Sequence, residues 1–363
     1  MIPRVCWHIC SNRWNSAVTE YALSAALAMR MRGWNSVFSP LIGSPAETRA
    51  RALGLPTIPF ASFHPGSFAK FKNTSRAIKA EAVIVYGGQE ATLLRLDRSL
   101  RSTVKVRFFG QSNWQKRQWF HRAINHLTGP FPDIVIAPGP SLSRSMSAAM
   151  GRSVESVPLG VNTDRFHFNP DAQPKGGVSE LLVLGRFDPV KGHSFFFQCV
   201  ARVFATLEPG KFRLHVAGRP ANIPTEEIRL AAQKAGLVEG QNFCITAGDI
   251  GDVAALMNSA VGGAVPSLGS ELICRVAEEF LLCGTPIIVS GVGSLGDILF
   301  PGAGVAYADN NPQQITDKLR SFILGASREA ARDRQERARV ASRHYSLVTM
   351  GERLDQLIGC RNL

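Results

Sequence analysis

Two glutamates stand eight positions apart in a mostly apolar stretch of the chain. Glu271 opens the run ELICRVAEEFLL, and Glu279 lies two helical turns further along it. Burying a carboxylate among apolar residues is costly unless a cation or a ligand binds it. Arg275 lies four residues before Glu279 and three before Glu278, and such helix-surface pairs contribute only about 0.3–0.5 kcal/mol. Two interpretations stay open. The glutamates could form helix-surface ion pairs with Arg275, a role that Glu278 alone can fill, or they could belong to a ligand site.

The start of this run predicts a place for an anion. If a helix begins near Leu272, its first backbone N–H groups are unpaired and carry partial positive charge. Ser270 or Glu271 would cap the helix, and an anion would bind at its mouth. Glu279 would then lie on the same helix face, two turns deeper.

A second group of charges lies in the run LLVLGRFDPVKGH, residues 181–193. A strand-like segment ends at Gly185, and Arg186 and Lys191 follow on a loop that Gly192 closes. Two cations at the carboxyl end of a strand suit an anion, and a diphosphate would accept hydrogen bonds from both. Two solvated loop charges are the alternative interpretation.

The sequence offers little for a redox cofactor or a metal. Gly291, Gly293 and Gly296 match the letters of the dinucleotide-binding fingerprint, but Pro301 stops any helix that would have to follow them. No D-x-D occurs, and no His or Cys cluster has metal-ligand spacing. We therefore expect no metal and no cofactor.

The elements that must position these residues alternate between β-rich and helical patterns, which predicts an α/β protein with parallel sheets and crossover helices. Residues 168–180 are rich in Pro, Gly and polar residues and look like a linker. We expect an N-terminal domain over residues 1–168, a C-terminal domain over 169–345, and a tail over 346–363 that packs back on the N-terminal domain. Ligands bind at the carboxyl ends of strands in such sheets.

The net charge of +13 is unevenly distributed. Residues 1–165 hold 21 Lys and Arg against 8 Asp and Glu, whereas residues 166–363 hold 20 of each. This asymmetry predicts an anionic partner for the first half, with a solvated basic surface as the alternative. Residues 68–81 and 113–126 mix Lys and Arg with Phe and Trp, which suits an anionic membrane surface; solvated helix faces are equally compatible.

The seven cysteines are scattered and form no C-x-x-C pair, which is typical of buried free thiols in a reducing compartment. The first residues do not resemble a signal peptide, and no apolar run approaches the roughly 20 residues that span a bilayer. We expect a cytoplasmic protein, at most peripheral on the inner face of the membrane.

Three motifs in this order resemble the retaining GT-B glycosyltransferases of family 4, also called glycosyl transferases group 1. They are SVPLGVNTDRFHFNP (156–170), GRFDPVKGH (185–193) and PSLGSELICRVAEEFLLCGTPIIVSGVGSLGDIL (266–299). The spacing of Glu271 and Glu279 matches the E-x7-E pattern of that family. The resemblance covers nearly the whole chain and is specific from about residue 156 to 305.

The resemblance implies a GT-B fold, in which two Rossmann-like domains place their parallel sheets across a cleft, with a nucleotide sugar, most often UDP-linked, bound in the C-terminal domain. Arg186 and Lys191 would bind the donor diphosphate, Glu271 the sugar hydroxyls and Glu279 the ribose. Arg186, Lys191 and Glu271 would be the catalytic residues. The donor-binding set would be Gly185, Arg186, Lys191, Asp249, Ile250, Glu271, Leu272, Ile273, Cys274 and Glu279, with Asp249 and Ile250 beside the base.

The same resemblance implies transfer of a hexose, without a metal and with retention of configuration, to a hydroxyl of a cell-envelope or lipid-linked glycan. The N-terminal half departs from the family pattern. Ser16 and Ala17 stand where many relatives carry a Gly-Gly loop that meets the donor phosphate. Phe109, followed by Gly110, stands where many carry a histidine on the acceptor side.

Three other functions remain open at this stage. An epimerase or a phosphorylase with the same fold would share these motifs, and so would a catalytically inactive scaffold. A nucleic-acid-binding protein would explain the basic first half, but no RRM, KH or helix-turn-helix signature occurs. We therefore expect a nucleotide sugar, a glycan or glycolipid acceptor and an anionic membrane surface as partners, and no nucleic acid.

Overall fold

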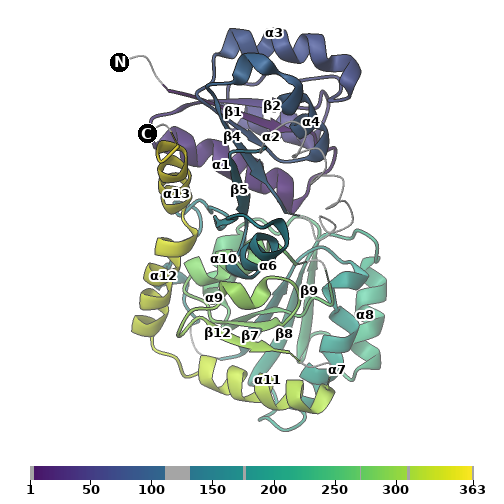
Figure 1. The fold of residues 1–363 in the computed structure, drawn as a ribbon. Helices are drawn as coiled ribbons and strands as arrows, with labels where there is room; N and C mark the ends of the chain where they lie inside the picture. Colours follow the sequence, from purple (N-terminus) through teal and green to yellow (C-terminus); the bar gives the residue numbers. More distant parts are fainter. Residues whose placement is uncertain (1–3, 111–130, 175–176, 270, 309–310, 362–363) are drawn as a thin grey trace. The chain divides into compact units, whose positions relative to one another are not determined.

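The computed structural model describes residues 4–110, 131–174, 177–269, 271–308 and 311–361 (Figure 1). The chain divides into two compact units, one of Met1–Val161 with His344–Leu363 and one of Asn162–Arg343. Each unit contains a parallel sheet of six strands. The predicted α/β class with parallel sheets is confirmed.

The first unit has the strand order β2-β1-β3-β4-β5-β6. Strand β1 has the sequence VCWHIC and is buried from Cys6 to Cys10, as expected of a central parallel strand. The strands are β1 (Val5–Cys10), β2 (Asn35–Pro40), β3 (Ala82–Val85), β4 (Val104–Phe108), β5 (Ile134–Ala137) and β6 (Glu155–Ser156). The helices are α1 (Ala17–Met31), α2 (Pro45–Ala52), α3 (Phe68–Ile78), α4 (Gly88–Leu96), α6 (Pro140–Met150) and α13 (Leu347–Gly359).

The second unit has the strand order β12-β11-β10-β7-β8-β9. The strands are β7 (Ser179–Leu184), β8 (Phe212–Gly218), β9 (Phe243–Ala247), β10 (Gly262–Val265), β11 (Ile287–Ser290) and β12 (Gly304–Tyr307). The helices are α7 (His193–Phe204), α8 (Thr225–Lys234), α9 (Val253–Ser259), α10 (Arg275–Leu282) and α11 (Pro312–Ala326), and α12 (Ala331–Tyr345) follows them.

The strand order of the second unit determines where its loops meet. β7 and β10 pair with each other although β8 and β9 lie between them in the sequence. The chain adds β8 and β9 on one side of β7, and β11 and β12 on the other side of β10. Such a switch point leaves a crevice at the carboxyl ends of the two central strands, where open α/β sheets bind ligands.

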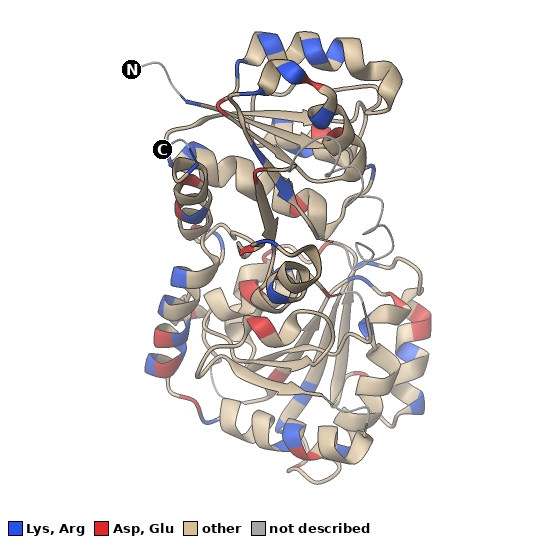
Figure 2. Cartoon of the chain, in the orientation of Figure 1, with Lys and Arg blue, Asp and Glu red and all other residues tan. Residues whose placement is uncertain are grey.

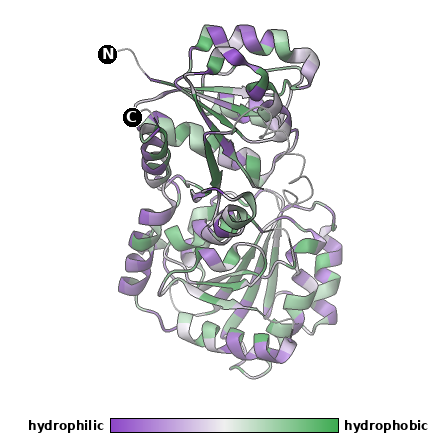
Figure 3. Cartoon of the chain, viewed as in Figure 1, coloured by the Kyte–Doolittle hydropathy of each residue, from purple (hydrophilic) through white to green (hydrophobic). Residues whose placement is uncertain are grey.

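The two faces of β7 and β8 differ in character. Val183 and Val216 belong to a core that they share with Phe196 and Phe197 of α7. Because side chains alternate along a strand, the opposite face of β8 carries His215, which is only partly buried. Figure 3 shows hydrophobic residues along the strands of each unit and hydrophilic residues along α12.

The division between the units differs from the predicted domain limits. The sequence predicts that the first domain ends at residue 168 and that the C-terminal tail begins at residue 346. The boundaries between the compact units instead fall after Val161 and after Arg343. The last helix, α13, packs against α1 of the first unit. Among the described residues, no helix combines the length and apolar composition of a membrane-spanning segment.

A buried arginine fixes α12 to the second unit. The Arg334 guanidinium is 3% exposed and donates hydrogen bonds to the Ala260 carbonyl (2.9 Å), the Asn258 carbonyl (3.0 Å) and the Thr285 hydroxyl (2.6 Å). Burial lowers its pKa to about 10, so the side chain stays charged at neutral pH. Without these three acceptors the buried cation would be strongly destabilising.

We predict that Arg334→Leu lowers the free energy of unfolding by about 3 kcal/mol, because the three acceptors lose a charged donor. The midpoint of urea unfolding measures this change. Arg332→Leu, on the exposed side of the same helix, is the matched control and should change it by less than about 0.5 kcal/mol. Equal effects of the two substitutions would contradict the assignment.

Candidate functional site

The segment formed by residues 266–269 and Glu271 follows β10 and is held by the loops on both sides of it. The Leu268 N–H group donates to the Val190 carbonyl at 2.7 Å, and the Ser294 N–H group donates to the Glu271 carbonyl at 2.7 Å. The first bond ties the segment to the loop after β7, and the second ties it to the loop after β11. Glu271 therefore occupies a defined place at the carboxyl ends of the central strands.

Two glycines allow this close approach. Gly192 and Gly293 have φ angles of +71° and +64°, which L side chains rarely adopt. A Cβ atom at Gly192 would lie 2.2 Å from the Pro266 carbonyl oxygen, and one at Gly293 would lie 2.2 Å from the Glu271 carbonyl oxygen. Both positions consequently require glycine for the backbone contact as well as for the backbone angle.

The Glu271 carboxylate is the buried centre of the site. Its side chain is 4% exposed and forms an ion pair with the Lys191 ammonium. The Ser267 hydroxyl donates a second hydrogen bond to the same oxygen, at 2.6 Å. The structure thus brings together two residues that lie 80 positions apart and that the sequence predicted for one site.

The loop after β7 presents a cation to solvent. The Arg186 side chain is 59% exposed and lies 3.4 Å from the carboxylate of Asp188. Asp188 is buried and accepts hydrogen bonds from the Val190 N–H group (3.1 Å) and the Asn222 amide (2.8 Å). Asp188 has two other hydrogen-bond donors, and an ion pair whose cation is largely exposed contributes little to stability, so the guanidinium can exchange its partner for a ligand.

Sequence reasoning missed the residues that position this loop. Asp188 caps the short turn Pro189–Lys191, and the D-P-x-x-G pattern was a signal that could have identified it. Asn222 gave no signal, because its partner Asp188 lies 34 positions earlier on another loop. Ser267 lies only four positions before its partner Glu271, but a serine at that spacing outside a regular element is not a recognised pattern.

The prediction that the helix begins near Leu272 is wrong. α10 begins at Arg275, and Cys274 precedes it without a side-chain capping bond. The hydrogen bond from Ser294 to the Glu271 carbonyl, together with the close approach of Gly293, holds this backbone out of helical geometry. Within the described part of the chain, no hydrogen bond is formed by the N–H groups of residues 272–274, and Ser270 lies outside the described residues.

The pairing of the following glutamates also differs from expectation. Arg275 forms its ion pair with Glu279, not with Glu278. Glu278 is 4% exposed, and one of its carboxylate oxygens has no hydrogen-bond partner among the described residues. Burial raises the pKa of Glu278 well above its usual value, and the adjacent Glu279 adds to this shift. The prediction of Glu278 as a helix-surface partner is therefore wrong.

Glu279 itself is a buried carboxylate. It is 3% exposed; burial raises its pKa, and the Arg275 guanidinium opposes this shift. Its partner Arg275 is the first residue of α10, one turn before it. The pair lies on the helix that follows the Glu271 segment, so both predicted carboxylates belong to the same loop-and-helix element.

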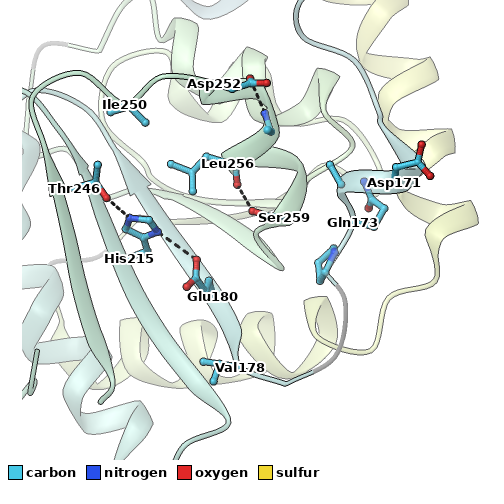
Figure 4. A pocket seen from close by; sticks show the side chains of 13 residues that line it. Asp171, Gln173, Val178, Glu180, His215, Thr246, Ile250, Asp252, Leu256 and Ser259 are labelled. Carbon is cyan, nitrogen blue, oxygen red and sulfur yellow. Dashed lines mark hydrogen bonds and ion pairs between the residues drawn. The ribbon is translucent and has the colours of Figure 1, made fainter. Parts of the chain in front are cut away.

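Asp249 and Ile250 lie apart from this centre, in the loop after the edge strand β9. Ile250 lines a cavity of about 660 Å³ (Figure 4). Thr246, His215 and Glu180 line its sheet side, and Leu256 of α9 lies opposite them. Among the described residues, no hydrogen bond or ion pair joins Asp249 or Ile250 to the Glu271 centre.

In the first unit, the residues predicted at the phosphate loop lie at the start of helix α1. The Ser16 hydroxyl accepts a hydrogen bond from the Thr19 N–H group and caps α1, and Ala17 is the first helical residue. The Asn12 amide donates to the same hydroxyl at 2.6 Å. The backbone that follows β1 is thus organised as a helix start.

The acceptor-side positions carry no acid or base. The Phe109 ring lies 4.2 Å from the Arg107 guanidinium, and Gly110 follows it. Nearby, the fully buried Glu90 accepts a hydrogen bond from the Ser11 N–H group at 3.1 Å. Burial raises the pKa of Glu90 and lowers that of Arg107 to about 10. Sequence analysis did not single out Glu90 or Arg107.

Part of the basic charge of the first half lies on one described helix. Figure 2 shows Lys and Arg along α3. Lys70, Lys72 and Arg76 belong to this helix, Lys79 follows it, and the helix contains no acidic residue. The second basic segment, residues 113–126, lies outside the described residues.

Comparison with known proteins places this geometry in context. A sequence model of the family described as glycosyl transferases group 1 matches residues 179–324, within the second unit. No curated protein is significantly similar to the chain in sequence. Solved structures, in contrast, align with almost the whole chain.

HepE of Anabaena, solved with UDP and glucose, aligns with a TM-score of 0.76 and 15% identity over 98% of this chain and 100% of its own. A glycosyltransferase from Rickettsia africae aligns with a TM-score of 0.79 and 14% identity over 99% and 98%. The lipopolysaccharide outer core galactosyltransferase WaaB aligns with a TM-score of 0.74 and 12% identity over 98% and 99%.

The chain has the GT-B fold. The predicted fold class is therefore confirmed in both of its Rossmann-like halves. In this GT-B chain the Lys191–Glu271 pair lies at the switch point of the second sheet, between the ends of β7 and β10.

We predict that Gly192→Ala lowers the free energy of unfolding by about 2 kcal/mol, because the new Cβ atom requires a strained φ angle and meets the Pro266 carbonyl. Urea unfolding measures this change. Gly325→Ala, in α11, is the matched control: nothing lies within 4 Å of its added Cβ, and alanine favours a helix over glycine by about 1 kcal/mol. A Gly192→Ala protein as stable as the control would contradict this account of the loop.

Proposed function

We propose that the protein is a glycosyltransferase that moves a sugar from a nucleotide-sugar donor to a hydroxyl of a glycan acceptor. The observation that carries this proposal is the pairing of Lys191 with Glu271 at the switch point of the second sheet, with Arg186 exposed on the same loop as Lys191. Two cations beside a buried carboxylate provide partners for both a diphosphate and a sugar hydroxyl. The family model matched over residues 179–324 supports the same interpretation.

The donor in this proposal is a UDP-linked hexose. HepE, with a similar fold, was solved with UDP and with UDP-glucose, which supports a uridine nucleotide. Arg186, Lys191 and the N–H groups of residues 272–274 would bind the diphosphate, and Glu271 would accept hydrogen bonds from the sugar. Glu279 would bind the ribose, with Gly185 leaving room beside the phosphates.

The base would lie towards Asp249 and Ile250. These residues follow β9, which is separated from β7 only by β8. Two strand spacings correspond to about 10 Å, a distance that a nucleotide diphosphate can span. The separation of Ile250 from Arg186 and Lys191, which follow β7, is therefore compatible with one extended donor.

The proposed reaction depends on stabilising the leaving group. The bond between the anomeric carbon and the diphosphate oxygen breaks, and the acceptor oxygen bonds to the same face of that carbon. The acceptor proton passes to the departing phosphate oxygen, so that UDP and the glycoside are formed with retention. Arg186 and Lys191 would stabilise the negative charge that develops on the diphosphate, without a metal.

Glu271 is poorly suited to act as the nucleophile in this scheme. Its carboxylate is already paired with Lys191 and Ser267, and these interactions lower the reactivity of its oxygens. We therefore assign it to orienting the sugar while it holds Lys191 beside the diphosphate.

We propose a lipid-linked or cell-envelope glycan as the acceptor, at the cytoplasmic face of the membrane. WaaB and WaaG, both with similar folds, are lipopolysaccharide glycosyltransferases by description. The basic helix α3 of the first unit would attract an anionic lipid surface.

We predict that a UDP-sugar raises the thermal midpoint of the wild-type protein more than the matching GDP- and ADP-sugars do. Arg186→Ala should weaken UDP-sugar binding by about 10- to 100-fold, because one charge-assisted contact to the diphosphate is lost. Arg332→Ala, an exposed arginine of the same unit, is the control. Equal midpoints with all three donors would exclude a nucleotide-selective site.

We predict that Glu271→Gln keeps the fold and lowers the rate of sugar transfer by about 100-fold or more, because the amide no longer holds Lys191 by charge. Sugar incorporation into a panel of glycans measures this rate. Intact turnover in this variant would remove Glu271 from the site. UDP release without sugar incorporation, tested over a panel of glycans, would point instead to an epimerase or a phosphorylase.

We predict that replacing Lys72, Arg76 and Lys79 by glutamine lowers affinity for phosphatidylglycerol-containing vesicles roughly 100-fold, at about 1 kcal/mol per basic residue. Vesicle sedimentation measures this affinity. Replacing Lys211, Lys234 and Arg332 of the second unit removes the same charge and is the control. An equal loss in both triple variants would show that net charge, and not α3, determines binding.

A further inference from the structure

Three metal-binding side-chain types meet on one face of the second sheet, apart from the Lys191–Glu271 pair. Glu180 lies on β7, His215 on β8 and Cys244 on β9. His215 and Cys244 are direct partners in the β8–β9 register, and Glu180 is paired with Arg213, two residues before His215. One ligand atom from each of the three residues lies within 4.8 Å of the other two.

The distances among these atoms approach those of a tetrahedral site. His215 Nδ1 lies 3.2 Å from Glu180 Oε2. Bonds of about 2.0–2.3 Å to a zinc ion place neighbouring ligand atoms about 3.3–3.8 Å apart. Small rotamer changes, without movement of the strands, would therefore complete the coordination by the imidazole, the carboxylate and the thiolate.

The surrounding residues orient the imidazole. His215 Nε2 lies 2.9 Å from the Thr246 hydroxyl (Figure 4). If Nε2–H donates to this hydroxyl, Nδ1 is the ligand atom that faces Glu180, and a metal ion would replace the proton that Nδ1 donates to that carboxylate. A hydrogen bond from a neighbouring group to the second ring nitrogen is the usual way in which proteins orient a metal-binding histidine.

Arg213 does not prevent this coordination. Its guanidinium pairs with Glu180 Oε1, whereas Oε2 faces His215. A carboxylate can bind a cation through one oxygen while the other accepts from an arginine. The alternative is an ion-pair network of Glu180, Arg213 and His215 on a partly buried sheet face, to which the Cys244 thiol adds a hydrogen bond with His215.

We propose that Glu180, His215 and Cys244 bind one divalent ion of the zinc type, with its fourth coordination position directed to the 660 Å³ cavity. A thiolate with an imidazole favours zinc over calcium or magnesium. Glu180 is the second residue of β7, whereas Arg186 lies beyond the carboxyl end of that strand. The ion would fasten the edge strand β9 to β7 and β8, and it takes no part in the proposed transfer reaction.

The experiment is a titration of the metal-free full chain with Co²⁺, followed by the thiolate-to-cobalt charge-transfer band in the near ultraviolet, and then displacement by Zn²⁺. We expect one equivalent bound. Cys244→Ser should abolish the band, and His215→Gln should weaken binding at least 100-fold. Cys360→Ser, which removes an exposed cysteine of the other unit, is the matched control and should leave binding unchanged.

Thr246→Val separates the proposed site from an adventitious thiol. It removes only the hydroxyl that orients His215, so it should weaken Co²⁺ binding by about 10- to 100-fold while the charge-transfer band remains. Absence of stoichiometric binding, a band that persists in Cys244→Ser, or one that disappears in Cys360→Ser would overturn the proposal. If Cys244→Ser fails to fold, the other two variants decide the question. Weaker Co²⁺ binding in His215→Gln and Thr246→Val supports the proposed site, and unchanged binding overturns it.

Discussion

The burial of the Glu271 carboxylate is the constraint on which the second unit depends. An ionised carboxylate that is only 4% exposed requires compensation by a cation and by hydrogen bonds. Lys191 and Ser267 supply it, but Lys191 lies on the loop after β7 and Glu271 lies beyond β10. These loops meet because β7 and β10 are adjacent strands at the switch point. The sheet order thus makes the ion pair possible, and the ion pair in turn fixes both loops.

The two cations of the proposed donor site differ in how firmly they are held. Lys191 is held by a buried carboxylate, whereas Arg186 is largely exposed and only loosely paired. A diphosphate would therefore meet one cation that is already oriented and one that can reach out to it. Because the lysine is oriented before the ligand arrives, less ordering entropy opposes donor binding, and the cation is in place when charge develops on the leaving group.

The sequence predicts those parts of the molecule that local pattern determines. The apolar run that ends at Gly185 identifies strand β7, and GRFDPVKGH identifies the cation loop that follows it. Both can be predicted because the residues concerned lie within a few positions of each other. The start of α10 could not be predicted, since a hydrogen bond from Ser294 to the Glu271 carbonyl, from 23 residues away, keeps the preceding residues out of the helix. The burial of Glu278 and the meeting of His215 with Cys244 depend on packing and strand register in the same way.

The charged side chains that follow the central strands differ between the two units, and this difference affects which ligands each unit can bind. In the second unit, cations surround the ends of β7 and β10. In the first unit, a carboxylate, Glu90, binds the Ser11 N–H group just after β1, at the start of the loop in which the resemblance implied a phosphate contact at Ser16 and Ala17. A buried acid there disfavours an anion whenever it is ionised. The excess basic charge of the first unit instead includes the surface helix α3, where it remains solvated and can act at a distance of about one Debye length. That placement favours attraction to an extended anionic surface over binding of a single phosphate.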